Sequence, residues 1–256
     1  MSLNEAKTWH FDAADGIPLA VHEMGEGRPL ILIHGYISDA ETNWIKYGHA
    51  ALLAEAGFRV IMPDLRAHGE SGKPHDPASY PKDILADDQF LLIEHLGLID
   101  FDLAGYSLGG RTVARMLARG SAPRRVVISG MGLKGLTDTE ARGDHFRHVL
   151  TNLGQHERGS PAFMAEAFLK TSGGDPVALL RVLDSFVDTP IEEIGGFDLP
   201  VAVVCGEADQ DNGSASALAE TLPQGTLIGV PGNHMSAVVK PELGQAIRNF
   251  LLGDKT

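Results

Sequence analysis

The stretch Gly105-Tyr106-Ser107-Leu108-Gly109 decides the fold of this chain, because it places a serine where a strand meets a helix. Residues 101–104 form a short apolar run that predicts a strand, and residues 111–119 have apolar side chains on one helical face. A turn this tight strains its central residue and tolerates almost no side chain two positions before or after it. The two glycines meet that need, so we interpret Ser107 as a nucleophile.

A serine nucleophile needs a base, and the base needs an acid to orient it. Residues 199–206 (LPVAVVCG) predict a buried strand, and an acidic cluster follows at its carboxyl end. We take Asp209 in this cluster as the orienting acid, with Asp211 as its main rival. Residues 225–231 (GTLIGVP) predict another strand, and His234 follows it as the candidate general base.

The order Ser107, Asp209, His234, each after a strand, resembles the α/β-hydrolase superfamily. The resemblance extends over nearly the whole chain. Residues 31–36 (ILIHGY) look like the third strand and the His-Gly oxyanion loop of that family, and residues 64–71 (DLRAHGES) look like its next strand-end loop.

The resemblance implies that the backbone N–H groups of Tyr36 and Leu108 form the oxyanion hole. The chain departs from the HGGG form of some lipases and esterases because Tyr36 and Ile37 replace glycines, which argues against bulky or tertiary-alcohol esters. The serine also argues against the haloalkane dehalogenase and epoxide hydrolase branches, which have aspartate at this position.

The hydrophobic pattern predicts an α/β fold with a mostly parallel, twisted sheet and helices on both faces. Asp15-Gly16 indicates an opening antiparallel hairpin. Short strands are then expected at 30–33, 59–63, 101–104, 125–129, 200–205 and 226–230, and helices near 44–56, 82–96, 109–119, 213–222 and 241–252.

The segment between Gly130 and Leu199 is longer than a crossover between parallel strands needs. We expect a hydrolase core of residues 1–130 and 191–256, with a small helical cap inserted at 131–190. Helices are expected at 162–169 and 177–186. By resemblance, pocket-lining residues are expected among Phe163, Met164, Phe168 and Phe186, although apolar side chains at helical spacing also fit the interior of the cap. Tyr36 and Trp44 predict an aromatic-walled pocket of modest size.

The composition and charge of the chain limit the classes of molecule that it is expected to bind. The formal charge of −13 disfavours nucleic acid, because phosphate backbones are bound by clustered Lys and Arg. The first residues are polar and no run approaches ~20 apolar residues, so we expect no membrane partner. Cys205 is the only cysteine, which excludes an intrachain disulfide and favours the cytoplasm. The oligomeric state stays open, and a homo-oligomer is compatible with the sequence.

The other histidines and acids give weaker patterns. His145 and His148 lie three residues apart on a possible cap helix, where a solvated helix face is favoured over a metal site. The stretch from Asp209 to Glu220 fails as a calcium loop because Ser214 stands where glycine is required. We therefore expect no metal and no cofactor. His34 and His68 are interpreted as structural, with Asp64 and Arg66 fixing His68 by charge-assisted hydrogen bonds.

The sequence thus predicts a serine hydrolase that acts on a small ester, lactone or thioester, a small-molecule acyl substrate, through an acyl-enzyme. A cofactor-free perhydrolase or haloperoxidase-like activity and carbon–carbon bond hydrolysis use the same three residues and stay open. A non-enzymatic ligand receptor that retains the fold is the alternative from another class.

Overall fold

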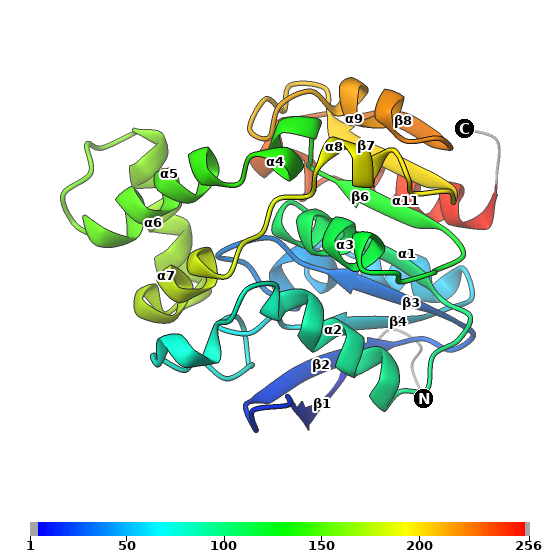
Figure 1. Cartoon of the computed structure of the whole chain (residues 1–256), viewed down its shortest axis with the longest axis horizontal. Coiled ribbons are helices and arrows are strands. Elements are labelled where there is room, and N and C mark those ends of the chain that lie inside the picture. The colour runs from blue at the N-terminus through cyan, green and yellow to red at the C-terminus, as the bar shows by residue number, and fades with distance from the viewer. Residues whose placement is uncertain (1–4, 254–256) are drawn as a thin grey trace.

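The computed structural model describes residues 5–253 and contains an eight-stranded sheet (Figure 1). The strands are β1 (Lys7–Asp12), β2 (Pro18–Met24), β3 (Arg28–Ile33), β4 (Phe58–Pro63), β5 (Asp102–Tyr106), β6 (Val126–Ser129), β7 (Val201–Gly206) and β8 (Gly225–Val230). Their order across the sheet is β1-β2-β4-β3-β5-β6-β7-β8. β2 pairs antiparallel with β1 and β4, and all later pairs are parallel. The predicted fold class is confirmed.

Helices cover both faces of the sheet. Buried residues of α1 (His49–Glu55) and α11 (Pro241–Leu252) pack with one face, and those of α2 (Ile84–His95), α3 (Leu108–Ala118) and α9 (Ala215–Thr221) pack with the other. Leu30 and Leu32 of β3 belong to the first core, and Ile31 and Ile33 to the second. This alternation explains why the parallel strands are apolar throughout.

The helix predicted near 44–56 is divided in two. A π-helical turn, η1 (Glu41–Ile45), precedes α1, and the left-handed backbone of Gly48 (φ 80°) separates them. The short 3-10 helix η2 (Pro77–Ser79) follows β4.

Five helices lie between β6 and β7: α4 (Leu133–Thr137), α5 (Glu140–Thr151), α6 (Pro161–Ser172), α7 (Pro176–Asp184) and α8 (Ile191–Ile194). Figure 1 shows α5, α6 and α7 beyond one end of the sheet. The two helices expected in this segment correspond to α6 and α7, which begin at the capping residues Ser160 and Asp175. α5 falls at the possible cap helix that carries His145 and His148, for which the sequence indicates no bounds because most of its residues are polar or charged.

The apolar side chains of α5, α6 and α7 are continuous with the main core. Leu150, Leu169, Leu179 and Val182 are buried in the same cluster as Ile31 and its neighbours on the sheet. The division of the chain into a core and a cap at 131–190 therefore stays a prediction.

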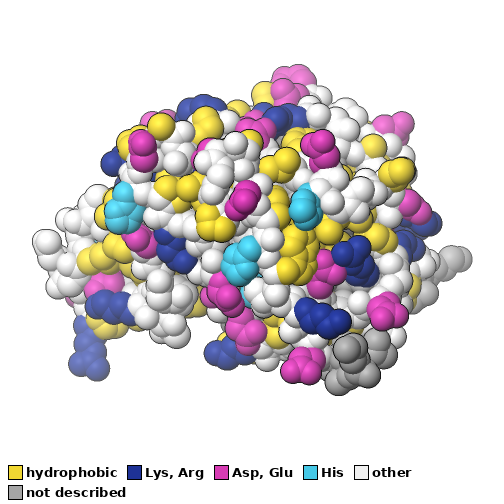
Figure 2. Space-filling view, turned by 90° about the horizontal axis from the view of Figure 1, so that it is seen from below, with side chains coloured by type: hydrophobic (Ala, Val, Ile, Leu, Met, Phe, Trp, Pro, Cys, Tyr) yellow, Lys and Arg dark blue, Asp and Glu magenta, His cyan; other side chains and the backbone are white. Residues whose placement is uncertain are grey.

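The surface has charges of both signs. On the face in Figure 2, Asp and Glu side chains lie among Lys and Arg side chains and apolar groups. Among residues 5–253, none of the helices combines the length and apolar character that a membrane crossing requires.

The turn between β5 and α3 has the strained geometry expected of it. Ser107 has φ 54° and ψ −112°, a backbone conformation that L-residues rarely adopt. A Cβ atom on Gly105 would lie 2.3 Å from the backbone carbon of Gly109, and one on Gly109 would lie 2.0 Å from the Ile33 carbonyl oxygen. The turn therefore forms only with glycine at both positions, and it brings α3 against β3.

Gly109→Ala should destabilise the protein, because the atom that its Cβ meets belongs to the backbone of a central strand. We expect the free energy of unfolding to fall by about 3 kcal/mol, measured by urea denaturation. Gly143→Ala in α5 is the matched control, since its Cβ would meet nothing within 4 Å, and it should raise the free energy by about 0.5–1 kcal/mol. Equal stability of Gly109→Ala and wild type would contradict this account of the turn.

Candidate active site

Ser107, His234 and Asp209 form a hydrogen-bonded chain at the carboxyl ends of three strands. Ser107 follows β5, Asp209 follows β7, and His234 begins α10 (His234–Ala237) after β8. His234 Nδ1 lies 2.8 Å from Asp209 Oδ2, and His234 Nε2 lies 3.0 Å from Ser107 Oγ. Because an ionised carboxylate only accepts hydrogen bonds, Nδ1 donates to Asp209, and in the neutral imidazole Nε2 is left as an acceptor for the serine hydroxyl.

The position of His234 is set by its neighbours. Asn233 and Ser236 form a reciprocal capping box at the start of α10. The buried Tyr106 hydroxyl donates to the His234 carbonyl oxygen at 2.5 Å, which ties α10 to the strand that carries Ser107. These contacts hold the imidazole from the backbone side and leave Nε2 facing the serine.

The two candidate acids have different partners. Asp209 is buried and contacts His234, whereas Asp211 is exposed and pairs with Arg142 of α5, Nη2 to Oδ2, at 2.8 Å. Burial raises the pKa of Asp209, but the hydrogen bond from His234, the charge of that imidazole and the smaller hydrogen bonds to Asp209 together outweigh burial, and the net pKa is lowered. Asp209 is therefore ionised at neutral pH. The structure brings Asp209, and not Asp211, to the imidazole.

The loop after β3 lies beside Ser107. A Cβ atom on Gly35 would be 3.5 Å from Ser107 Cβ. Among the residues that the structure describes, no hydrogen-bond acceptor pairs with the backbone N–H of Tyr36 or of Leu108. Two unpaired donors near the serine oxygen are what an oxyanion hole requires.

His34 helps to hold this loop as a neutral residue. Its Nε2 accepts from the Leu65 N–H at 2.9 Å, and its Nδ1 donates to the Gly35 carbonyl at 2.8 Å. Burial lowers the pKa of His34, which keeps the ring uncharged. The Gly35 N–H donates to Asn43 Oδ1, so the loop is held both by the His34 ring and by a side chain of η1.

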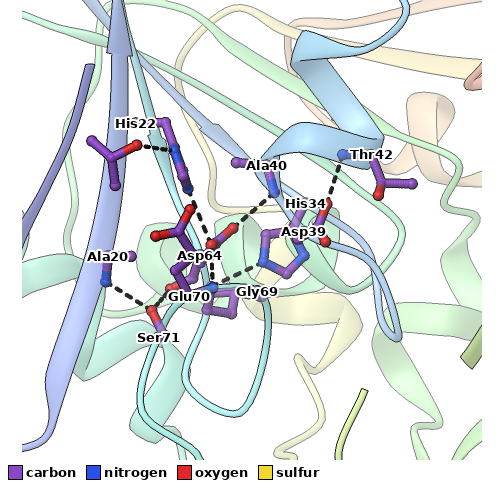
Figure 3. Close-up of polar contacts among 12 residues, drawn as sticks. Ala20, His22, His34, Asp39, Ala40, Thr42, Asp64, Gly69, Glu70 and Ser71 are labelled. Carbon is purple, nitrogen blue, oxygen red and sulfur yellow. Dashed lines mark hydrogen bonds and ion pairs between the residues drawn. The ribbon is translucent and has the colours of Figure 1, made fainter. Parts of the chain in front are cut away.

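Figure 3 shows a second polar network, centred on the buried carboxylate of Asp64. Asp64 accepts from His22 Nε2 at 3.1 Å and from the N–H groups of Ala40 and Glu70, each at 2.8 Å. A Cβ atom on Gly69 would lie 2.0 Å from Asp64 Oδ2, which requires glycine there. The network joins β2, the loop after β3 and the loop after β4.

The expected fixation of His68 by Asp64 and Arg66 side chains is wrong. His68 Nδ1 donates to the Arg66 backbone carbonyl at 2.9 Å, and burial lowers the pKa of His68 to about 3, so the ring stays neutral. The Arg66 guanidinium instead pairs with Asp15 and Asp88. Asp64 in turn accepts from His22 and from backbone N–H groups, so neither charged side chain is bonded to His68.

A cavity opens next to Ser107, with about 280 Å³ of space between the protein atoms, part of it open to solvent. Its walls are formed by Tyr36, Ser107, Leu108, Arg111, Met131, Arg142, Phe146, Phe186 and Asn212.

Only one of the four expected cap residues lines this cavity, namely Phe186. Phe163 and Met164 are exposed on α6, and Phe168 packs against the core. α5 contributes Phe146 to the cavity, whereas no residue of α6 lines it. The expectation for α6 was wrong because apolar spacing along a helix does not show whether its apolar side chains face the cavity, the core or solvent.

The cavity has aromatic side chains in its wall, as expected, but these are Tyr36, Phe146 and Phe186, without Trp44. Tyr36 lines the cavity, its ring centroid lies 4.7 Å from that of Phe146, and its hydroxyl donates to the Leu179 carbonyl at 2.7 Å. Trp44 is wholly buried in the core on the α1 side of the sheet and does not line the cavity. The sequence analysis did not identify Arg111 and Arg142 as cavity residues. The signal for Arg111 was its position one helical turn after the serine, and Arg142 had no such signal.

Comparisons with known proteins agree with this architecture. A family model described as "alpha/beta hydrolase fold" matches residues 28–127. The chain is 34% identical over 157 residues to a non-heme haloperoxidase of Rhodococcus erythropolis, which covers 56% of this chain but only 54% of that protein. It is 28% identical over 229 residues to the non-heme chloroperoxidase CPO-A1 of Kitasatospora aureofaciens, covering 77% and 79% of the two chains. The solved esterase EaEST of Exiguobacterium antarcticum matches with a TM-score of 0.78 at 18% identity, covering 95% of this chain and 98% of that one.

The Asp64–His22 pair should make stability depend on pH. Burial raises the pKa of Asp64 and lowers that of His22, but their mutual hydrogen bond together with nearby charges and backbone N–H groups outweighs burial, so the net pKa of Asp64 falls while that of His22 rises. The Asp64 contribution is therefore lost as the pH falls below about 4, and the His22 contribution is lost as the pH rises above about 6.5.

We expect Asp64→Asn to lower the free energy of unfolding by about 3 kcal/mol near pH 5.5, with a smaller loss at pH 3.5 and at pH 8. Urea denaturation at the three pH values measures this. Asp12→Asn, at an exposed position, is the control and should have little effect. A loss that does not change with pH would refute the linkage.

Proposed function

Because this chain belongs to the α/β-hydrolase superfamily and joins Ser107, His234 and Asp209 by hydrogen bonds, we propose that it is a serine hydrolase cleaving a small carboxylic ester, lactone or thioester. The observation that carries the proposal is the 3.0 Å contact between His234 Nε2 and Ser107 Oγ, with Asp209 on the opposite side of the imidazole. Nucleophile, base and orienting acid in this arrangement define acyl transfer by a serine.

In the first half-reaction, Ser107 Oγ attacks the carbonyl carbon of the substrate while His234 Nε2 takes the hydroxyl proton. The carbonyl oxygen becomes an oxyanion, which accepts hydrogen bonds from the N–H groups of Tyr36 and Leu108. Asp209 stabilises the imidazolium. His234 then gives its proton to the leaving alcohol or thiol as the bond to the acyl carbon breaks, which leaves the acyl-enzyme.

In the second half-reaction, water replaces the leaving group. His234 takes a proton from the water molecule, whose oxygen attacks the acyl carbon and forms a second tetrahedral intermediate. The proton on His234 passes to Ser107 Oγ as the acyl bond to the serine breaks, which releases the carboxylic acid and restores the free enzyme. Tyr36, Phe146 and Phe186 enclose the acyl group in the small cavity, which favours short acyl chains.

Ser107→Ala should lower turnover about a million-fold, because the covalent step is lost. The measurement is hydrolysis of a p-nitrophenyl ester series from acetate to decanoate, with wild type and variant side by side. Activity in the wild type should be highest for the short esters. Equal turnover by the two proteins would refute the proposal, and a maximum at decanoate would refute the short-chain preference.

The acid is tested by a matched pair of variants. Asp209→Asn should lower kcat about 10⁴-fold, because the amide no longer holds the imidazole in the reactive tautomer. Asp211→Asn, two residues away and paired with Arg142, should change kcat by less than about tenfold because it does not contact His234. The reverse ranking would assign the acid to Asp211.

A perhydrolase activity is the second candidate, favoured by the relatives named as haloperoxidases. Here H₂O₂ attacks the acyl-enzyme in place of water, and the product is a peracid, which oxidises bromide in solution. Bromination of monochlorodimedone in the presence of H₂O₂, acetate and bromide measures this activity, and it should be absent in Ser107→Ala. Bromination that needs no acetate would argue against the acyl-enzyme route.

A further inference from the structure

The wall of the cavity contains a buried cation that has no anionic partner. Arg111 lies one helical turn after Ser107, and its backbone N–H donates to the Ser107 carbonyl at 3.0 Å. The residue is only 5% exposed, and its Nε has no hydrogen-bond partner. Among residues 5–253, no carboxylate forms an ion pair with it.

The other fully buried arginine shows what a structural role would look like. The Arg66 guanidinium bonds to Asp88 and Asp15, which neutralise it and raise its pKa. For Arg111, burial instead lowers the pKa to about 10, which still leaves the group charged at neutral pH. A buried, unpaired charge is costly to the folded state, and such groups are frequent at functional sites.

Arg111 lines the cavity next to Ser107. Its guanidinium carbon lies 4.7 Å from the centroid of the Phe186 ring. Arg111, Phe186 and Leu108 also line an adjoining cavity of about 270 Å³, so Arg111 lies at the boundary of two hollows.

The remaining charges of the cavity do not neutralise Arg111. Arg142, the other cation in the wall, is already paired with Asp211. Asp188 and Asp138 act on Arg111 only from beyond ion-pair distance. The cavity therefore has one uncompensated positive charge next to the candidate nucleophile.

We propose that Arg111 binds a carboxylate of the substrate, so that the enzyme acts on half-esters or half-thioesters of short dicarboxylic acids. The inference rests on the proposed serine hydrolase function. The planar guanidinium matches a carboxylate in a bidentate manner, and one uncompensated charge fits a monoanion. Ser107 and Arg111 line the same small hollow, so an acyl group bound there would have its free carboxylate only a few carbons from the carbonyl that Ser107 attacks.

The first test compares the monoethyl and diethyl esters of malonic, succinic, glutaric and adipic acids, with ethanol release as the readout. The monoester and the diester of one acid have the same acyl chain and differ only in whether the second carboxyl group is free or esterified. Wild type should show a kcat/KM at least about tenfold higher for the best monoester than for its diester. A ratio at or below one, with the diesters still hydrolysed, would overturn the inference and leave the proposed function intact.

Two variants assign the selectivity to Arg111. Arg111→Met should lower the ratio of monoester to diester kcat/KM by about 100-fold, because a buried charged hydrogen bond is lost. Arg158→Met removes the same charge from an exposed loop and should leave the ratio unchanged. Equal loss in both variants would mean that only the overall charge matters, which would overturn the inference.

Stability separates a binding role from a structural one. Arg111→Met leaves no carboxylate unpaired, so its melting temperature should equal or exceed that of wild type. A fall in melting temperature together with an unchanged ester ratio would make Arg111 a structural residue and contradict the inference.

Binding can be measured without turnover. Glutarate should bind to Ser107→Ala in a calorimetric titration, and the binding should disappear in the double variant with Arg111→Met. If no ester is hydrolysed but glutarate binds in this way, the proposed function fails while the anion site stands. If glutarate does not bind, the anion site itself is refuted.

Discussion

The contact between the start of α3 and the backbone of β3 is the constraint on which the site depends. Gly109 lies so close to the Ile33 carbonyl oxygen that any side chain would displace the helix, and the same approach forces Ser107 into a left-handed conformation. The strain lifts the serine above the sheet edge. The packing of β3 between β4 and β5 in both cores holds this geometry, because no single contact in the turn is strong enough to do so.

The loops around the serine are held by polar groups that are buried and satisfied. Asp64 connects the loops after β3 and β4 to β2, and His34 connects the oxyanion loop to Leu65 (Figure 3). Because a buried carboxylate or imidazole without partners is costly, each loop is stable only when the other is in place. In the proposed mechanism, this interdependence would fix the N–H group of Tyr36 before the oxyanion forms.

The cavity combines an aromatic wall with one unneutralised guanidinium. Phe146 from α5 and Phe186 after α7 face Tyr36 and Arg111 from the core, so the segment between β6 and β7 and the sheet both shape the pocket. Under the proposed function, the aromatic rings would limit the size of a bound acyl group, and Arg111 would bind its free carboxylate.

The sequence by itself determined the fold and the chemical identity of the candidate triad, because both depend on local patterns. Glycines around Ser107, and acidic and imidazole groups directly after apolar strands, are visible in short windows, and the carboxyl ends of parallel strands meet at one sheet edge. Only the tertiary structure shows which acid contacts the imidazole: Asp209 does, whereas Asp211 pairs with Arg142. Only the tertiary structure shows the members of the pocket wall, among them Phe146 of α5, and the absence of an ion-pair partner for Arg111 among residues 5–253. These contacts depend on long-range packing, which the spacing of residues along the chain does not encode.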